Sequence, residues 1–399
     1  MSPNEKESEA VVKNLIREVI VTSHIVNSLD TILDSTTTAD YQVHISFTPE
    51  DDAWDTFLAK AQGGHHVQTG LWAQVKGVLG WGVIRVVVTS GNKHIVGGAQ
   101  IMVRRFRGLG KIGIISKGPL FSSSNPILTM LIIKELVHLA KLNHIQFLVV
   151  QPPNNGEETG RQLAHFGFNP VRMTINPTAT ILIDLHKDLD TIQSEIKQST
   201  RRNIRIAQRK GITIREGTEA DIGRFYVALK ATSRRKNFAT FPIEYYHRMW
   251  ELFAPRGYAR LFVAEYEGET VSSQLAISFG DTVINKMTAW SGEYSSLRPN
   301  EALYWAVIQW AKAHGFRYYD LEGINADAAQ EIAETNKVPD SVRKTFTPFK
   351  VGFGGKITFF PGAYVYISNP ILRTAYRIIL PKVYQSPLMM KVMGHLRTS

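Results

Sequence analysis

The segment KQSTRRNIRIAQRK, from Lys197 to Lys210, contains six basic residues and no acidic residue. If the segment is helical, Arg201, Arg205 and Arg209 fall at positions i, i+4 and i+8, on one face. Closely spaced positive charge of this kind suits the phosphates of a nucleic acid, although it is also typical of an ordinary solvated face. The candidate RNA-binding residues are Arg201, Arg202, Arg205, Arg209 and Lys210.

A lysine among aromatic residues is the second candidate for chemistry. Lys350 lies between Phe349 and Phe353 in the stretch FKVGFGG. A partly desolvated ammonium can stabilise negative charge that develops on a reacting carbonyl oxygen, whereas a packed surface lysine would do nothing of the kind. Tyr319 and Asp320 end a predicted strand, where ligand sites of α/β sheets gather. Asp320 is therefore a candidate base, or simply a cap for the loop that follows.

Several reaction classes lack their motifs in this sequence. The chain has no cysteine, which excludes disulfides, thiolate metal sites and a cysteine nucleophile. Its 12 histidines show no metal-ligand spacing such as H-E-x-x-H, and neither a G-x-S-x-G elbow nor a Walker A motif occurs. We therefore expect no bound metal, no serine hydrolysis and no P-loop chemistry.

One segment, RFRGLG from Arg105 to Gly110, fits the R-x-x-G-x-G loop that holds pyrophosphate in coenzyme A-dependent acetyltransferases. Such a loop works because its backbone N–H groups continue into a helix N-terminus. Here the following residues, 111–115, have the pattern of a strand. We therefore predict a hairpin turn at this position.

The composition is that of a globular protein that has a polyanionic partner or simply a basic surface. The 399 residues are 44% hydrophobic and 20% charged, and the net charge is +11. No apolar run reaches the roughly 18 residues that span a bilayer. The opening residues MSPNEKESEA are polar and acidic, unlike a signal peptide. We therefore expect a cytoplasmic protein.

The elements that must position these residues follow an α/β pattern from about Gln42 onward. In the first half we predict strands at 43–48, 83–89, 94–103, 112–118 and 145–151. We predict helices at 49–62 and 126–142, and a further helical stretch after the last strand that ends in RQLAHFGF (161–168). In the second half we predict helices at 188–209, 219–236, 242–254 and 300–315, and strands at 259–266, 271–279, 282–290 and 316–323. Residues 324–348 are expected to form an insertion loop.

The two halves resemble each other in residues as well as in order. AKLNHIQF (140–147) matches AKAHGFRY (311–318) at an offset of 171 residues, a similarity that duplication or chance could produce. We divide the chain into four parts. They are an N-terminal extension with a short helix (1–41), a first domain (42–177), a second domain (178–361) and a helical tail that packs on the first domain (362–399).

Seven segments in order resemble the Fem-type aminoacyltransferases, the FemABX group, over about Val43 to Tyr364. They are VQTGLWAQVKG (67–77), SKGPL (116–120), STRRNIRIAQRKGI (199–212), PIEYYHRM (242–249), LFVAEYEG (261–268), IQWAKAHGFRYYDLEGI (308–324) and FKVGFGG (349–355). The resemblance implies an α/β (α+β) fold of two tandem GNAT-like domains, each a mixed sheet flanked by helices. It also implies aminoacyl-tRNA-dependent addition of an amino acid to the peptide of a peptidoglycan precursor.

The family's functional residues map onto matching positions. Lys76, which ends W-A-x-V-K, matches the lysine that meets the phosphates of a nucleotide-linked precursor, and Trp72 belongs to the same motif. Tyr245 of P-I-E-Y is implied to line the same groove. Lys350 matches the lysine placed at the reacting carbonyl, with Phe349 beside it. Each of these residues could also serve packing alone.

The sequence departs from the family pattern at three positions. Phe241 stands where relatives that bind the nucleotide-linked precursor can have an arginine, Phe147 replaces a tyrosine, and Pro152 replaces an acid. The form of the acceptor, UDP-linked or lipid-linked, therefore stays open. We count Phe241, Phe147 and Tyr319 among the candidate substrate-binding residues.

The resemblance implies amide synthesis in which an amine attacks the tRNA ester, with Asp320 or Glu322 as a candidate base. The ester is already activated, so we expect no cofactor besides the co-substrate aminoacyl-tRNA, and we expect a monomer. A lipid-linked muropeptide would place the protein at the inner face of the membrane. Two alternatives stay open: an acyl-CoA-dependent N-acyltransferase on the same fold, and a non-catalytic RNA-binding protein.

Overall fold

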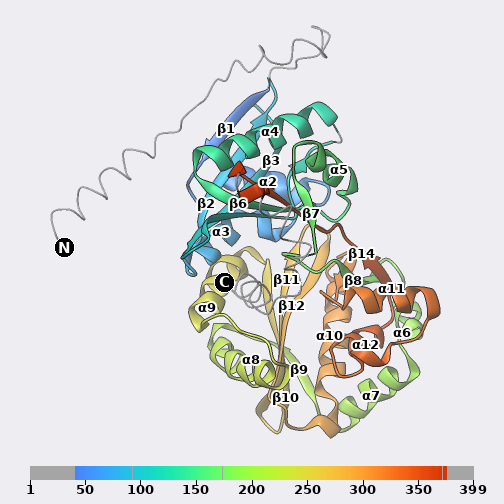
Figure 1. Ribbon diagram of the computed structural model, residues 1–399. Coiled ribbons are helices and arrows are strands. Elements are labelled where there is room, and N and C mark those ends of the chain that lie inside the picture. Colours follow the sequence, from blue (N-terminus) through green and yellow to red (C-terminus); the bar gives the residue numbers. More distant parts are fainter. Residues whose placement is uncertain (1–40, 92, 124, 173, 371, 375–399) are drawn as a thin grey trace, which may run out of the picture. The chain divides into compact units, whose positions relative to one another are not determined.

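The computed structural model describes residues 41–370 and 372–374, apart from residues 92, 124 and 173. These residues form two compact units, each with its own sheet (Figure 1). The first unit runs to Val171 and resumes at Ala363, and the second runs from Arg172 to Gly362. The helix expected within residues 1–27 lies outside the described residues.

The first unit contains a mixed sheet whose strands follow the order β1-β2-β3-β4-β6-β15-β7, with β5 beside β3. Strands β4 and β6 are parallel, and the other neighbours are antiparallel. Its elements are β1 (Gln42–Ser46), α2 (Asp52–Lys60), the 3-10 helix η2 (His66–Gln68), α3 (Gly70–Gly77), β2 (Gly82–Thr89), β3 (Ile95–Phe106), β4 (Gly110–Ser116), β5 (Leu120–Phe121), α4 (Pro126–Leu142), β6 (Ile145–Gln151), α5 (Glu157–His165), β7 (Asn169–Val171) and β15 (Ala363–Ile367).

Strand β15 returns the chain to the first sheet after the second unit is complete. Val365 pairs with Val149 of β6 on one side and with Asn169 of β7 on the other. We expected a helical tail over residues 362–399, and for residues 363–367 this prediction is wrong. The segment AYVYI is rich in the β-branched and aromatic residues that suit a buried strand. Residues beyond 374 of the expected tail lie outside the described residues.

The second unit repeats this plan with the strand order β14-β8-β13-β12-β11-β10-β9. Strands β12 and β13 are parallel, and the other neighbours are antiparallel. Its elements are β8 (Ala179–Asp184), α6 (Leu189–Glu195), α7 (Gln198–Arg209), β9 (Thr213–Glu216), η3 (Glu219–Asp221), α8 (Ile222–Lys236), α9 (Ile243–Phe253), η4 (Ala254–Arg256), β10 (Ala259–Tyr266), β11 (Glu269–Phe279), β12 (Thr282–Trp290), η5 (Ser295–Leu297), α10 (Pro299–Ala313), β13 (Tyr318–Asp320), α11 (Ala326–Thr335), η6 (Asp340–Val342), α12 (Thr347–Val351) and β14 (Lys356–Phe359).

The repeated plan is clearest at the one parallel pair of each sheet. A long apolar helix precedes the second strand of the pair in both units, α4 before β6 and α10 before β13. Both helices begin with proline at the first turn, where its missing N–H costs nothing. Asn125 caps α4 by accepting from the Ile127 and Leu128 N–H groups. The prediction of two mixed sheets flanked by helices is confirmed.

Residues 324–348, expected to be a loop, contain more structure than we predicted. Helix α11, the 3-10 helix η6 and the start of α12 all lie in this stretch. Asn325 caps α11 through a hydrogen bond of 2.8 Å from the Ala328 N–H. The helix buries Ala328, Ala329 and Ile332, a stripe too short and too alanine-rich to stand out as an amphipathic pattern.

Candidate functional site

The ammonium of Lys350 is held by the turn that follows β13. Its Nζ donates hydrogen bonds to the backbone oxygens of Glu322 and Gly323, the second at 2.9 Å. Both residues have positive φ, +51° and +23°. Among the described residues these two carbonyls are the hydrogen-bond partners of the ammonium. An ammonium has three N–H donors, so one remains that could bind a substrate oxygen.

Asp320 determines the shape of this turn. One of its carboxylate oxygens accepts from the Glu322 N–H at 2.7 Å and also from the Thr180 hydroxyl of β8. Asp320 itself is 9% exposed. The Asp320 carboxylate therefore ties the turn after β13 to strand β8. The Glu322 carboxylate instead points to Lys286, whose Nζ lies 3.5 Å away.

Aromatic side chains pack beside the lysine. The Tyr304 ring of α10 lies edge-on to Phe349, at 5.0 Å between centroids, and stacks on Phe353 at 5.1 Å. The hydroxyl of Tyr304 accepts from the Asn285 amide and lies 3.0 Å from the Thr288 hydroxyl. Burial raises the pKa of Tyr304 to about 12, so its phenol is neutral at physiological pH.

The electrostatics of the site lower the affinity of Lys350 for its proton. Burial lowers the pKa of Lys350 to about 8, and the carboxylates of Glu322 and Asp320 oppose this effect only in part. The lysine is therefore still mostly charged near neutral pH but is poorly solvated. A cation of this kind can stabilise an oxyanion more strongly than a solvated one, because little water screens it.

Tyr319 and Tyr245, two more predicted residues, also lie in the second unit. Tyr319 is fully buried, and its hydroxyl accepts from the Gln274 amide. Tyr245 of α9 is 2% exposed, and its ring lies 4.2 Å from that of Phe241. Burial raises the pKa of Tyr245 well above its ordinary value, and the Glu322 carboxylate adds to this effect. The Tyr245 phenol is thus within electrostatic reach of the turn that holds Lys350.

Lys76, Trp72 and Phe147 belong to the first unit. Trp72 and Lys76 lie on α3, one turn apart, and the Lys76 Nζ is 5.4 Å from the centroid of the Trp81 ring, a cation–π distance. Trp72 is 9% exposed and meets the His66 ring edge-on. Phe147 lies in β6, between its partners in β4 and β15.

Helix α7 presents its basic residues differently from the predicted stripe. Arg201 turns back and donates to the backbone oxygens of Ser194 and Ile196, at 2.6 and 2.7 Å, which caps the end of α6. The other five basic residues of the segment are exposed: Lys197, Arg202, Arg205, Arg209 and Lys210. The exposed arginines follow the spacing i, i+3, i+7, which is also one helix face.

The segment from Arg105 to Gly110 forms the turn between the antiparallel strands β3 and β4. Gly108 and Gly110 have φ of +81° and +76°, as a tight turn requires. The chain continues from Gly110 into β4 and not into a helix, as predicted. Its N–H groups therefore lack the helix N-terminus that a pyrophosphate loop needs.

Three residues of the Lys350 site escaped sequence reasoning. Tyr304 lies in the apolar stretch ALYWAVIQW, where it has the pattern of a core residue. Thr180 is 140 residues from Asp320, and no local motif marks it. Gly323 acts through its carbonyl alone. Within residues 41–374, as far as they are described, no cluster of histidine or acidic residues suits a metal ion, and no helix could span a membrane.

Both units match models of known families. Residues 50–162 match the FemAB family, and residues 196–329 match the acetyltransferase (GNAT) domain. The lipid II:glycine glycyltransferase of Staphylococcus saprophyticus is 22% identical over 411 residues, which cover 85% of this chain and 96% of that protein. The UDP-N-acetylmuramoylpentapeptide-lysine N(6)-alanyltransferase of Weissella viridescens is 24% identical over 294 residues, which cover 70% of this chain and 86% of that protein.

The fold has a counterpart among solved structures. The crystal structure of FemX aligns with a TM-score of 0.70 and 19% sequence identity, and it covers 82% of this chain and 97% of that chain. The likeness extends through both GNAT-like units. The FemAB match and the relatives that align over most of the chain agree, so the chain is similar to the Fem-type (FemABX) transferases, and its fold is that of two tandem GNAT-like units.

Proposed function

We propose that the protein transfers an amino acid from aminoacyl-tRNA to an amine in the peptide of a peptidoglycan precursor. The observation that carries the proposal is the desolvated Lys350 ammonium, held by two backbone oxygens with one donor remaining. Relatives that act on lipid II or on a UDP-linked muramoyl pentapeptide support the acceptor class. The use of aminoacyl-tRNA is the part of the proposal that rests on the family resemblance and on the basic surface.

The proposed reaction requires a positive group that stabilises the negative charge developing on the ester carbonyl oxygen. The acceptor amine attacks the ester carbonyl that joins the amino acid to the tRNA, and negative charge grows on the carbonyl oxygen. The Lys350 ammonium donates to that oxygen and stabilises the tetrahedral state. The carbon–oxygen ester bond then breaks and an amide remains. The ribose oxygen of the tRNA leaves with the bonding electron pair, takes up the proton that the amine releases, and becomes a hydroxyl. The activated ester supplies the driving force, so no further cofactor is needed.

Each substrate has a surface on the chain that suits its charge. The exposed residues Arg202, Arg205, Arg209 and Lys210 suit the phosphates of the tRNA. Lys76 suits the phosphates of the precursor, and Trp72, one turn away on the same helix, suits its apolar parts. Lys350 and Phe349 then act at the carbonyl, with Asp320 holding the turn in shape.

The precursor that accepts the amino acid can be UDP-linked or lipid-linked, and both forms need to be assayed. Phe241 and Phe147 stand at positions where a nucleotide-binding relative can carry polar residues. This difference favours the lipid-linked form, which would place the protein on the cytoplasmic side of the membrane, at its inner face.

The deciding experiment offers the full-length protein a mixture of charged tRNAs and one precursor, UDP-linked or lipid-linked, and weighs the product. A precursor heavier by one or more amino-acid residues, formed only with charged tRNA, supports the proposal. Transfer of an acetyl group from acetyl-CoA with no use of charged tRNA would replace it with an acyl-CoA-dependent activity. Binding of tRNA with no transfer to either precursor would point to a non-catalytic RNA-binding protein.

A further inference from the structure

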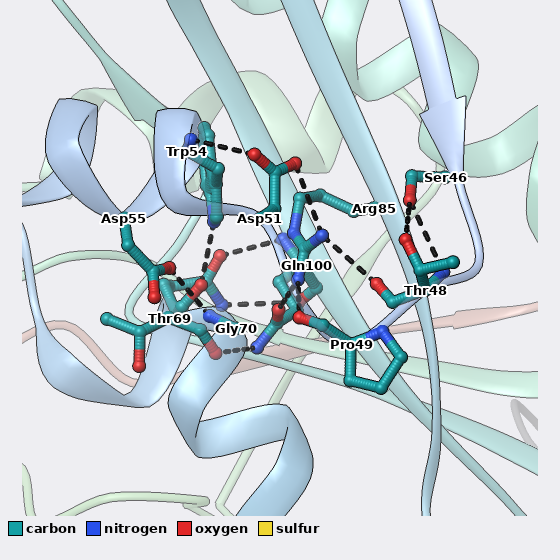
Figure 2. A network of polar contacts seen from close by, with 11 residues as sticks. Ser46, Thr48, Pro49, Asp51, Trp54, Asp55, Thr69, Gly70, Arg85 and Gln100 are labelled. Atoms are coloured by element: carbon teal, nitrogen blue, oxygen red, sulfur yellow. Dashed lines mark hydrogen bonds and ion pairs between the residues drawn. The ribbon is translucent and has the colours of Figure 1, made fainter. Parts of the chain in front are cut away.

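The start of helix α3 is bound by a carboxylate from a neighbouring helix. Asp55 of α2 accepts a hydrogen bond of 2.7 Å from the Gly70 N–H, the first residue of α3, as Figure 2 shows. Thr69 adds a second cap, because its hydroxyl accepts from the Trp72 N–H at 3.1 Å. A negative charge at a helix N-terminus is favourable, because the N–H groups there have no helical partner. The Asp55 carboxylate therefore holds α3 by its first turn.

A chain of buried hydrogen bonds supports the same point from the sheet. The Gln100 amide of β3 donates to the Thr69 backbone oxygen at 2.8 Å. The same side chain accepts from Arg85 of β2 at 2.7 Å, and Arg85 also donates to the Pro49 oxygen at 2.8 Å and to Asp51 at 3.3 Å (Figure 2). Arg85 is completely buried. The position where α3 begins is thus tied to β2, to β3 and to the residues before α2.

The backbone at Gly70 lies so close to its neighbours that α3 has little freedom to shift. A Cβ atom at Gly70 would lie 2.4 Å from the Pro49 oxygen and 3.1 Å from the Asp51 nitrogen. No side chain fits in this space. The start of α3 is therefore fixed by close packing as well as by hydrogen bonds, and the helix projects Trp72 and Lys76 from a rigid base.

The charge of Asp55 is kept at a cost. Burial raises the pKa of Asp55 to about 6, even though Arg85 and the Gly70 N–H favour the ionised form. A neutral hydrogen-bond acceptor could satisfy the Gly70 N–H without this penalty. Groups that are retained against their stability cost are concentrated at functional sites.

We propose that Asp55, supported by Arg85, is a positioning residue of the acceptor site: it fixes the first turn of α3 and so sets the place of Trp72 and Lys76. This inference rests on the proposed role of α3 in binding the muropeptide precursor. Asp55 does not touch the precursor itself. Its effect is on acceptor recognition, and the chemical step at Lys350 is left unchanged.

The test compares three substitutions in the full-length protein. Asp55→Ala removes the acceptor atom, and Asp55→Asn removes the charge but keeps an oxygen that can accept from Gly70. Asp52→Asn is the matched control, because Asp52 lies on the same helix and is exposed. Arg85 is left unchanged, because removal of a fully buried cation is expected to unfold the unit. Amide hydrogen exchange of residues 70–76 is measured for each, together with the steady-state constants for the precursor that the wild-type protein uses, UDP-linked muramoyl pentapeptide or lipid II.

We expect Asp55→Ala to raise hydrogen exchange in α3 and to raise KM for the precursor about tenfold, with kcat within about threefold of wild type. Asp55→Asn should raise KM less than Asp55→Ala does, because its amide oxygen can still accept from the Gly70 N–H. Asp52→Asn should match wild type. A merely structural role would lower the amount of active protein and so lower apparent kcat, leaving KM unchanged. Unchanged exchange, or faster exchange with unchanged KM, would overturn the inference.

The same experiment separates this inference from the proposed function. A wild-type protein that binds the precursor but transfers nothing contradicts the proposed reaction only. The variants are then compared by their dissociation constants for the precursor, and an equal constant in Asp55→Ala overturns the inference. A wild-type protein that does not bind either precursor contradicts both.

Discussion

In the second unit, the Lys350 ammonium lies 2.9 Å from the backbone oxygen of Gly323, a residue 27 positions earlier in the sequence. The contact joins α12 to the turn after β13 and so links the lysine to an interior strand of its sheet. Backbone oxygens orient an ammonium without neutralising it, whereas a carboxylate at the same distance would cancel much of its charge. The arrangement preserves a cation that is both fixed and effective.

Removal of this cation should slow the reaction and leave binding intact. Lys350→Met is expected to lower kcat by about 10²–10³-fold, or roughly 3–4 kcal/mol of transition-state stabilisation, with KM for the precursor within about threefold of wild type. Lys76→Met should do the opposite and raise KM first. Lys356→Met, an exposed lysine on β14, serves as the control. Full turnover in a folded Lys350→Met protein would mean that the lysine only packs against its neighbours.

The activity should fall at alkaline pH with the charge of Lys350. Because burial lowers the pKa of Lys350 to about 8, the ammonium loses its proton as the pH rises through 8, and kcat should decline above that point. Lys350→Arg tests the assignment, since a guanidinium stays charged throughout this range. The arginine variant is expected to be slower at pH 7 but to lack the alkaline decline. A decline near pH 8 that persists in Lys350→Arg belongs to another group.

Local sequence patterns were sufficient to predict most of the fold. Apolar periodicity marks α4 and α10, and β-branched runs mark β2 and β12, because in these elements burial follows the period of the chain. Strand β15 shows the limit of this reasoning. It opens a tail that we predicted to be helical, and its pairing with β6 and β7 makes it a strand.

The sequence was enough to predict which residues belong to the site, but not which contacts they make. The stretch FKVGFGG marked Lys350, but the Thr180–Asp320 hydrogen bond that shapes its turn spans 140 residues. The same limit applies to Arg201, whose charge suggested RNA binding although its side chain caps α6. A helical wheel gives the face of a residue but not the backbone oxygens that a neighbouring helix end leaves without partners.

The exposed arginines of α7 should govern tRNA binding and its salt dependence. Replacing Arg202, Arg205 and Arg209 together with alanine is expected to weaken binding and to lower the slope of log K against log salt by up to about 2–3, at roughly 0.7–0.9 per phosphate contact. Arg161→Ala, an exposed arginine of α5, is the control. Arg201→Ala should instead loosen the end of α6 and cost about 1 kcal/mol of stability. An unchanged slope in the triple variant would identify the stripe as a solvated face.

The partly buried carboxylate of Asp55 should leave a signature in the pH dependence of stability. The pKa of Asp55 is about 6 in the folded protein and 3.8 when the side chain is fully solvated, as in the unfolded chain, so the folded state binds more protons between these values. The free energy of unfolding contributed by Asp55 is therefore fully present below pH 3.8 and is lost as the pH rises through 6. Between pH 4.5 and pH 7 this loss amounts to about 2 kcal/mol.

Asp55→Asn removes the titrating group and with it this loss. Urea unfolding of both proteins across the same range should show the variant gaining about 2 kcal/mol relative to wild type as the pH rises. Asp52→Asn should show no such gain, because Asp52 is exposed. Asp55→Asn would then be more stable at neutral pH but would hold the first turn of α3 less firmly through the Gly70 N–H. This combination is expected where a charged residue is kept for function and lowers the stability of the fold. If the difference between the two proteins stays constant with pH, the Asp55 carboxylate is solvated and carries no penalty.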